Sequence, residues 1–526
     1  MFLVYNGQVQ KIKSIKGTDV MVNMKKLCAC GIVATILVAN LASCSSSKID
    51  NQETTTTFSE VSTLDTTTES KVVVEEKIPK YVFLFIGDGM GYPQIQATSY
   101  FKGKSERLSF MDYDVVGSVD TYNVDTTITD SASAATAIAT GYKTSTGTVS
   151  MNPPGMIKYE TIVEQLKRKL GYKIGIITSV SLNHATPAAF YAHSQSRDNY
   201  YEIGEQLAKS DVDFFAGGGF TDSTGEKNNK KSLYKCVREE GYNIYRKLED
   251  KESLKQEDSE KTILISEKNI KEGFMKYDMD LEEDEWHLCD YVSKGIEMLD
   301  NDKGFFMMVE SGKIDYANHS NDAATMIRET LAFDEAVQNA YKFYQEHPDE
   351  TLIIVTADHE SGGLSVGYSQ TAYSTYLSTL RKQKMSFYEF ENEYVTGYKN
   401  KEAPFEKVIA DIEKIYGTNF DEDEMQALMD AYFRTLEVGA LSKNKMNKQE
   451  YELYGKYDPL TVTISHIMNH KAGLDYTTYS HTGIQVPLYA TGIGSDEFYG
   501  YYDNTDIYKK IYKIMKLGEK HEKKNH

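Results

Sequence analysis

The chain has 526 residues, of which 40% are hydrophobic, 12% aromatic and 26% charged. This composition is typical of a folded globular protein and excludes wholesale disorder. Lys and Arg number 58 against 78 Asp and Glu, which gives a formal charge of −20. Because such a field repels phosphate backbones, we expect no nucleic-acid binding, and an anionic substrate must be drawn in by cations at its own site.

The first apolar segment has the pattern of an export signal. Two lysines precede the apolar run 27–41, which is short for a membrane span and leads into the motif Leu-Ala-Ser-Cys44. The pattern resembles a bacterial lipoprotein signal, which implies removal of residues 1–43 and a lipid on Cys44 that anchors the exported protein to a periplasmic or cell-surface membrane face. A plain secretory signal is the alternative. Since residues 1–23 lack this pattern, we expect translation to start at Met24.

The segments that flank the folded part also have distinct compositions. Removal of the signal takes away five lysines and one aspartate, leaving 53 basic and 77 acidic residues and a formal charge of −24. Residues 44–77 are rich in Ser and Thr, so we expect a tether, and residues 519–526 form a basic tail. Cys236 and Cys289 remain in the folded part, either as a disulfide or as two thiols.

Continuous apolar runs predict strands that are buried on both faces of a sheet. In chain order they are Tyr81 to Ile86, Lys173 to Thr178, Phe305 to Val309, Thr351 to Thr356 and Val486 to Ala490. Helical patterns occur between them, at 162–170, 323–344 and 505–515. This alternation predicts an α/β fold over residues 78–518, with a doubly wound, mostly parallel central sheet and helices on both faces.

Two stretches interrupt this alternation. Residues 222–284 are rich in Lys and Glu and have few apolar runs, and residues 366–476 form a long, mainly helical, Tyr-rich excursion. We expect both to be insertions in one domain.

Polar side chains follow three of the predicted strands. Asp88 comes after the first, Glu310 after the third, and Asp358 with His359 after the fourth. Ligands of an open parallel sheet bind at the carboxyl ends of its strands, so these side chains are candidate ligands at one rim. Each of them alone could be an ordinary turn or loop residue, but several such coincidences at one rim favour a site.

Asp315 and His319 extend this set. They are four residues apart, which places both on one face of a helical turn, and carboxylate plus imidazole is a common zinc pairing. An isolated pair with this spacing is usually a surface pair.

A candidate nucleophile lies within a run of mostly small residues, 129–141. Asp130 and Ser131 precede an alanine-rich stretch that predicts a tightly packed helix with Ser131 at its N-terminus. The helix dipole and a metal ion would favour the serine alkoxide. The alternative is that Asp-Ser merely caps the helix.

These motifs together resemble those of alkaline phosphatases. The motifs are Gly87-Asp-Gly-Met-Gly91, Thr129-Asp-Ser-Ala132, Ala185-Thr-Pro-Ala-Ala189 with His193 and Arg197, Glu310 with Asp315 and His319, Thr356-Ala-Asp-His359, and Ser480-His481-Thr482. They occur in family order over about residues 80–515. The resemblance implies hydrolysis of phosphate monoesters to an alcohol and inorganic phosphate, and it suggests a homodimer.

The resemblance also assigns roles. Ser131 would form a phosphoseryl intermediate, Arg197 would bind phosphate and Asp130 would orient Arg197. Two zinc ions and a third metal ion, usually magnesium, are implied. Their ligands would be Asp315, His319 and His481 for the first zinc, Asp88, Asp358 and His359 for the second, and Asp88, Thr186 and Glu310 for the third ion.

Three further residues would surround these ligands: His184, His193 and Tyr316. His184 stands where Asp is frequent in the best-known bacterial pattern, and Tyr316 where Lys or His is frequent. These departures leave the identity of the third ion open.

Two rival functions are weighed against this one. A phosphodiesterase or sulfatase of the same superfamily is disfavoured, because Ser131 lacks the sulfatase x-Pro-x-Arg context, and Arg197 with Thr186 and Glu310 suits monoesters. A lipoprotein that binds zinc or phosphate without turnover is disfavoured because Ser131 and all the expected ligands are present.

Overall fold

The computed structural model describes residues 2–5, 8–11, 77–256, 261–401, 403–437 and 447–519. The chain divides into two units, Met1–Val74 and Glu75–His526. In the first unit, strand β1 (Phe2–Tyr5) pairs antiparallel with β2 (Gln8–Lys11). The predicted cleavage site, Cys44 and nearly all of the tether lie outside the described residues.

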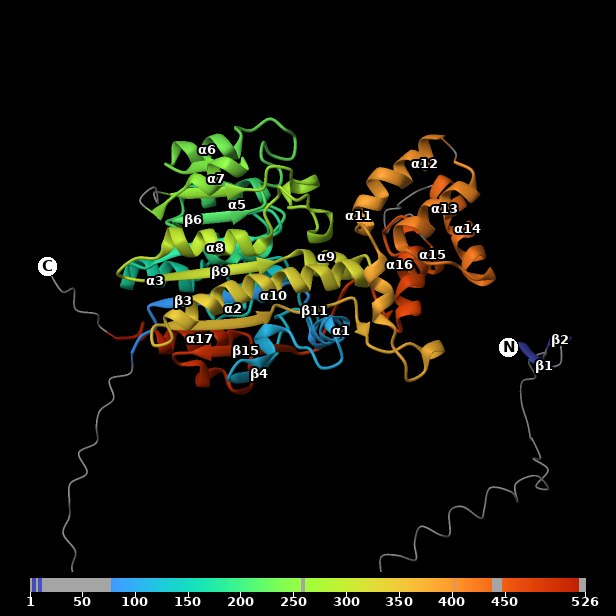
Figure 1. The fold of residues 1–526 in the computed structure, drawn as a ribbon. Helices are drawn as coiled ribbons and strands as arrows, with labels where there is room; N and C mark the ends of the chain where they lie inside the picture. The colour runs from blue at the N-terminus through green and yellow to red at the C-terminus, as the bar shows by residue number, and fades with distance from the viewer. Residues whose placement is uncertain are drawn as a thin grey trace, which may run out of the picture. The chain divides into compact units, whose positions relative to one another are not determined.

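The second unit is built on a ten-stranded sheet (Figure 1). All five predicted strands are present, and the mostly parallel α/β fold is confirmed. The strand order is β16 (Gly500–Asp503), β4 (Val115–Asp120), β15 (Val486–Gly492), β10 (Thr351–Ala357), β3 (Tyr81–Gly87), β9 (Phe305–Ser311), β5 (Lys173–Thr178), β6 (Phe214–Gly217), β8 (Thr262–Ile265) and β7 (Asn243–Tyr245).

One predicted strand, β15, is not parallel, although the alternation of strands and helices in the sequence predicts parallel strands. β15 is antiparallel to both of its neighbours, β10 and β4. The reason lies in the preceding residues: β14 (His481–Thr482) pairs with β11 (Glu360–Ser361), just beyond the carboxyl end of β10. The chain therefore enters β15 from the carboxyl rim and runs antiparallel to β10, so the helical segment between the two strands does not form a crossover connection.

The stretch 222–284 also contains strands that its composition does not predict. It contributes β8 and β7, which extend the sheet beyond β6 as parallel strands. All four residues of β8 are buried. Because this apolar segment is short and charged residues flank it, the sequence pattern does not predict it as a strand.

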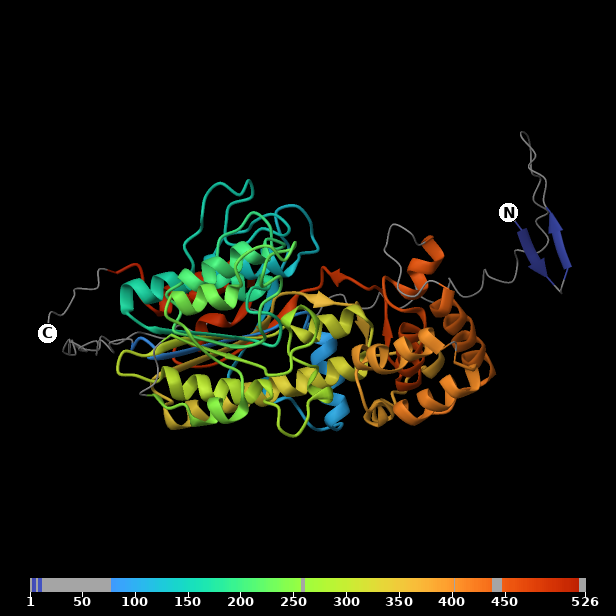
Figure 2. The same cartoon turned by 90° about the horizontal axis from the view of Figure 1, so that it is seen from above.

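Helices cover both faces of the sheet (Figure 2). On one face α8 (Leu288–Leu299) and α10 (Ala323–Glu346) pack together, with α1 (Tyr92–Lys102) against α10. On the other face lie α2 (Ser131–Thr140), α3 (Ile162–Leu170), α4 (Ala185–Tyr191) and α17 (Thr505–Ile514). The three predicted helices are α3, α10 and α17. Three more helices occur in the chain near the strands at the β7 end of the sheet. They are α5 (Tyr200–Lys209), which precedes β6, and α6 (Leu233–Glu239) and α7 (Leu248–Ser253), which flank β7.

The central strand β3 shows why the sheet is stable. All seven of its residues are buried, and Phe83 and Phe85 pack against aromatic rings of β9 and α10. Burial of each such side chain stabilises the fold by about 1.5–3 kcal/mol. A strand buried on both faces needs apolar residues at every position, which explains the continuous run in the sequence.

The segment 366–476 is mainly helical, as predicted, and its helices gather beyond one end of the sheet (Figure 1). They are α11 (Phe387–Phe390), α12 (Thr396–Lys401), α13 (Phe405–Tyr416), α14 (Glu422–Glu437), α15 (Lys448–Tyr454) and α16 (Pro459–Ala472). The buried N-cap of α10, Asp322, ties this segment to the body by accepting hydrogen bonds from Gln383 and from the backbone N–H of Phe387.

Cys236 and Cys289 are both free thiols in the structure. Burial raises the pKa of Cys289 to about 12, so its thiol stays protonated at neutral pH. None of the described helices is long and apolar enough to cross a membrane.

Candidate metal and phosphate site

The carboxyl ends of three adjacent strands carry acidic or imidazole side chains. Asp358 follows β10, Asp88 follows β3, and Glu310 lies at the end of β9. Because β3 lies between β10 and β9 in the sheet, Asp88 stands between the other two residues. Helix α9 (Lys313–His319) begins directly after β9 and carries Asp315. Strand pairing thus brings together groups that are far apart in the sequence: the backbone N–H of Gly89 donates to Asp358, which is 269 positions away.

The first potential ligand group contains Asp315, His319 and His481. His319 Nε2 lies 3.1 Å from Asp315 Oδ2 and 3.2 Å from His481 Nε2. Each histidine donates its Nδ1–H to a backbone carbonyl, His319 to Tyr479 (2.7 Å) and His481 to Thr129 (2.8 Å). Both Nε2 lone pairs are therefore free to face one cation, the usual arrangement of zinc-bound histidines.

The second group contains Asp88, Asp358 and His359, all completely buried. His359 Nε2 lies 3.3 Å from Asp88 Oδ1, 3.4 Å from Asp358 Oδ2 and 3.3 Å from Ser131 Oγ. The candidate nucleophile thus lies beside this group.

The third group contains Asp88, His184 and Glu310, so Asp88 is shared between two groups. Thr186, at the start of α4, is fully buried, and its Oγ1 has no hydrogen-bond partner. Thr178 donates its hydroxyl to Glu310 Oε2. Burial raises the pKa of Glu310 to about 7.

The chemistry of these groups fits divalent cations. Buried ligand atoms of the three groups lack hydrogen-bond partners, namely both Asp88 oxygens, Glu310 Oε1, Asp315 Oδ1 and Asp358 Oδ2. Burial and the neighbouring carboxylates raise the pKa values of Asp88 and Asp358 well above the usual range. An unpaired buried carboxylate is costly, so a bound cation is the natural partner for this set.

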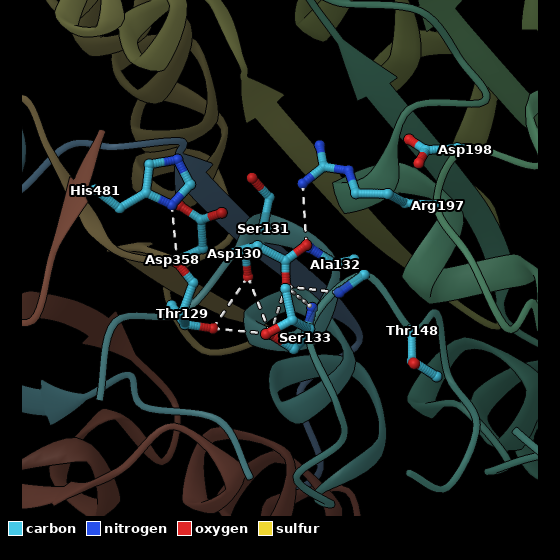
Figure 3. A network of polar contacts seen from close by, with 12 residues as sticks. Thr129, Asp130, Ser131, Ala132, Ser133, Thr148, Arg197, Asp198, Asp358 and His481 are labelled. Carbon is cyan, nitrogen blue, oxygen red and sulfur yellow. Dashed lines mark hydrogen bonds and ion pairs between the residues drawn. The ribbon is translucent and has the colours of Figure 1, made fainter. Parts of the chain in front are cut away.

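Ser131 occupies the first position of α2, and Asp130 precedes it as the N-cap (Figure 3). The Asp130 carboxylate accepts hydrogen bonds from the backbone N–H groups of Ala132 and Ser133, both at 3.2 Å. Asp130 therefore caps the helix, and the Ser131 hydroxyl stands at the positive end of the helix dipole.

Arg197 is held at this helix end by two side chains. Its Nη1 donates to Asp130 Oδ2 at 3.1 Å, and its Nη2 donates to His184 Nε2 at 3.1 Å. Burial alone would raise the pKa of Asp130, but the charge of Arg197 and hydrogen bonds from Ser133 and Gly147 lower it below its usual value. Burial and the Arg197 charge lower the pKa of His184 to about 3, so His184 is a neutral acceptor.

The remaining two predicted neighbours of the ligands differ in position. The Tyr316 hydroxyl lies 3.4 Å from His184 Nε2, at the edge of the site. The structure does not bring His193 to the site: its Nδ1 donates to the carbonyl of Ser150 (2.8 Å), and its Nε2 lies 3.3 Å from Glu164. His193 lines a separate cavity of about 780 Å³ between α3 and α5.

The segment 366–476 also reaches the first ligand group. Burial alone would lower the pKa of His319, but the carboxylate of Asp315 outweighs it and raises this pKa, and the charge of exposed Lys456 opposes the rise.

Sequence reasoning missed two fully buried side chains next to the ligands, Gln94 and Glu360. Gln94 Nε2 donates to Glu360 Oε1 at 2.7 Å. Glu360 directly follows His359 and could have been flagged on that ground, whereas nothing in the sequence around Gln94 indicates its position.

Comparisons with known proteins agree with this geometry. The family model described as alkaline phosphatase matches residues 79–517. Alkaline phosphatase 3 of Bacillus subtilis (strain 168) is 31% identical over 456 residues, which cover 84% of this chain and 90% of that protein. An alkaline phosphatase of Schizosaccharomyces pombe is 26% identical, covering 85% and 83% of the two chains.

Solved structures give the same result. A cold-active alkaline phosphatase from a psychrophilic Shewanella sp. superposes with a TM-score of 0.69 at 29% identity, covering 83% of this chain and 99% of that one. A mutant of the TAB5 alkaline phosphatase, with a histidine changed to glutamate and magnesium bound in its M3 site, gives a TM-score of 0.58 at 25% identity, with 84% and 99% covered. The chain therefore belongs to the alkaline phosphatase family.

Proposed function

We propose that this chain hydrolyses phosphate monoesters through a phosphoseryl intermediate on Ser131. The observation that carries the proposal is the position of Ser131 Oγ, which lies at the N-terminus of α2 and 3.3 Å from His359 Nε2 in the second ligand group. Arg197 approaches the same helix end, where it is held by Asp130. Ser131, the second ligand group and Arg197 are thus gathered at one helix end, and we infer that the phosphoryl group binds there.

The residues of the chain have distinct tasks in this reaction. Arg197 keeps three N–H donors beyond those used by Asp130 and His184, and they can bind two non-bridging phosphate oxygens. Ser131 Oγ loses its proton and attacks phosphorus; the ester P–O bond breaks, and the alcohol leaves with the electron pair and takes up a proton. Water then attacks the phosphoserine, Ser131 Oγ departs and is reprotonated, and inorganic phosphate is released.

Two zinc ions and a third divalent ion are proposed for the three groups. The first and second groups combine carboxylate and histidine donors, which suit zinc. At the third position His184 Nε2 accepts a hydrogen bond from Arg197, and the oxygen donors of Asp88, Glu310 and Thr186 suit magnesium. When bound, divalent ions lower the pKa of a serine hydroxyl and of water and neutralise charge on the leaving oxygen. The TAB5 mutant with magnesium in its M3 site supports a magnesium-compatible third position in this family.

Steady-state hydrolysis of p-nitrophenyl phosphate and bis-p-nitrophenyl phosphate tests the proposed reaction. With zinc and magnesium present, the protein without residues 1–43 should hydrolyse the monoester at least roughly 100-fold faster than the diester. The reason is that Arg197 and the third group stabilise anionic phosphate oxygens that a diester lacks. Preference for the diester would indicate a phosphodiesterase. A metal-loaded protein that turns over neither compound would support the rival role in binding alone.

We also propose export and lipid anchoring through Cys44. The basic residues, apolar run and Leu-Ala-Ser-Cys44 motif support it. In cells fed a radiolabelled fatty acid, the wild-type protein should incorporate label and sediment with membranes. Cys44→Ser should do neither, and an equally labelled Cys44→Ser protein would contradict the proposal. Cys236→Ser is the matched control and should keep the label.

A further inference from the structure

A polar network underlies the ligand groups without supplying any of their ligands. Its centre is Gln94 of α1, whose Nε2 donates to Glu360 Oε1 (2.7 Å) and to the carbonyl of Ser361 (2.8 Å) and lies 3.4 Å from Asn318 Oδ1. Gln94, Glu360 and Asn318 are fully buried. Buried side chains that are hydrogen-bonded to one another favour one arrangement of the groups they join, and the side chain of Gln94 is paired through Nε2 alone, since its Oε1 has no partner among the described residues.

Glu360 joins two segments that carry histidine ligands. Its Oε2 accepts the hydroxyl of Thr482, and its Oε1 also accepts the backbone N–H of Leu364 at 3.2 Å. The same residues pair through their backbones, since Glu360 stands opposite Thr482 in the β11–β14 ladder. The side-chain bond therefore fixes the register of this two-residue ladder, which is too short to define itself by backbone pairing alone.

Asn318 joins the other two segments. Its Nδ2 donates to the carbonyl of Gly89 at 3.4 Å, and its Oδ1 accepts the hydroxyl of Tyr476 at 3.1 Å. The contact with Gln94 then connects α9 with β11, so the network links the four segments that carry the ligands of the first and second groups.

Four of the network residues share one sequence relation to the candidate ligands. Each lies directly beside a ligand in the chain: Gly89 beside Asp88, Asn318 beside His319, Glu360 beside His359 and Thr482 beside His481. The rings of His359 and His481 stack with centroids 3.6 Å apart and planes 19° apart, as expected if the bond between their neighbours sets their spacing. The network thus acts on the ligands through the backbone.

We propose that Glu360, with Gln94 as its anchor, is a positioning residue that fixes the spacing between the first and second metal groups. The inference rests on the proposed function, because it concerns the affinity of those groups for zinc. Residues that hold ligands in place typically change metal affinity by about 10–100-fold when removed.

Thr482→Val is the sharpest test, because it keeps the shape of the side chain and removes only the bond to Glu360. We expect zinc affinity, measured by competition with a chromophoric chelator, to fall by about 10–100-fold for one of the two zinc ions. In the loaded enzyme we expect kcat for p-nitrophenyl phosphate to fall more than KM rises, because Arg197 is untouched. Glu360→Ala should have a larger effect, since it also leaves Gln94 Nε2 without its best acceptor.

Glu360→Gln provides the conservative rescue. Its carbonyl can still accept from Gln94 and Leu364, and its amide can donate to the Thr482 hydroxyl, which also accepts. We expect zinc affinity within about threefold of wild type. If Glu360→Gln bound zinc as weakly as Glu360→Ala, the hydrogen bonds would not be the cause and the proposal would be overturned.

Thr330→Val is the matched control for a general loss of stability. Thr330 is a buried threonine of α10 whose hydroxyl donates to the carbonyl of Met326. It should lower the urea midpoint while leaving zinc affinity unchanged. Equal zinc affinity in wild type and Thr482→Val would overturn the positioning role alone, whereas a wild-type protein that neither takes up zinc nor hydrolyses the monoester would overturn the proposed function itself.

Discussion

Ser131→Ala is expected to lower kcat for p-nitrophenyl phosphate by roughly 10³-fold or more, because loss of a covalent nucleophile removes the route through the intermediate. The fold should tolerate the change. Ser131 Oγ has one described hydrogen-bond partner, His359 Nε2, and Asp130 caps the helix without it. Zinc content and thermal stability should therefore stay close to those of wild type.

Ser133→Ala is the matched control two residues further along the same helix. The Ser133 hydroxyl donates to Asp130 Oδ1 at 2.6 Å, so its loss should disturb Asp130 and, through it, Arg197. We expect a higher KM for the monoester and only a small fall in kcat. Labelled inorganic phosphate should mark the wild-type and Ser133→Ala proteins at acid pH but leave Ser131→Ala unlabelled. A Ser131→Ala protein with a tenth or more of wild-type activity would contradict a role as nucleophile.

The centre of the fold was predictable because it is buried on both sides. β3, β9 and β10 are continuous apolar runs, and such runs are read directly from the sequence. The edge strand β16 and its neighbour β4 were missed because they are partly exposed and contain Gly and Asp. The antiparallel direction of β15 could not be predicted from its apolar run either, because it depends on the pairing of β11 with β14.

Part of the candidate ligand set was predictable for a related reason. Parallel strands end at one rim, so Asp88, Glu310 and Asp358 could be grouped before any contact was known. His481 and Arg197 have no such signal and depended on the family resemblance. Gln94 was missed because a glutamine on an ordinary helix carries no chemical signature, and its partner Glu360 lies 266 residues away in the sequence.

Removal of the metal ions by a chelator is expected to abolish monoester turnover and also to lower the thermal midpoint. Each occupied site adds about 4 kcal/mol to the free energy of unfolding when the free ion is present at 1,000 times its Kd. Activity and midpoint should both return when zinc and magnesium are added back. A chelated protein with undetectable zinc that kept its activity would contradict metal dependence.

Asp358→Asn separates loss of binding energy from general damage to the fold. Asp358 Oδ1 accepts the backbone N–H groups of Gly89 (3.2 Å) and His359 (3.0 Å), and asparagine can keep both bonds. In the metal-free protein the carboxylate is fully buried and repelled by Asp315, and these effects raise the pKa of Asp358 well above its usual value. Replacing it with a neutral amide should therefore leave the metal-free protein as stable as metal-free wild type, or more so.

With zinc present the order of the two stabilities should reverse, because the variant lacks a charged ligand. Urea unfolding of both proteins, with and without chelator, measures this reversal, and a variant that is less stable under both conditions would show that Asp358 supports the fold directly and not through a bound cation.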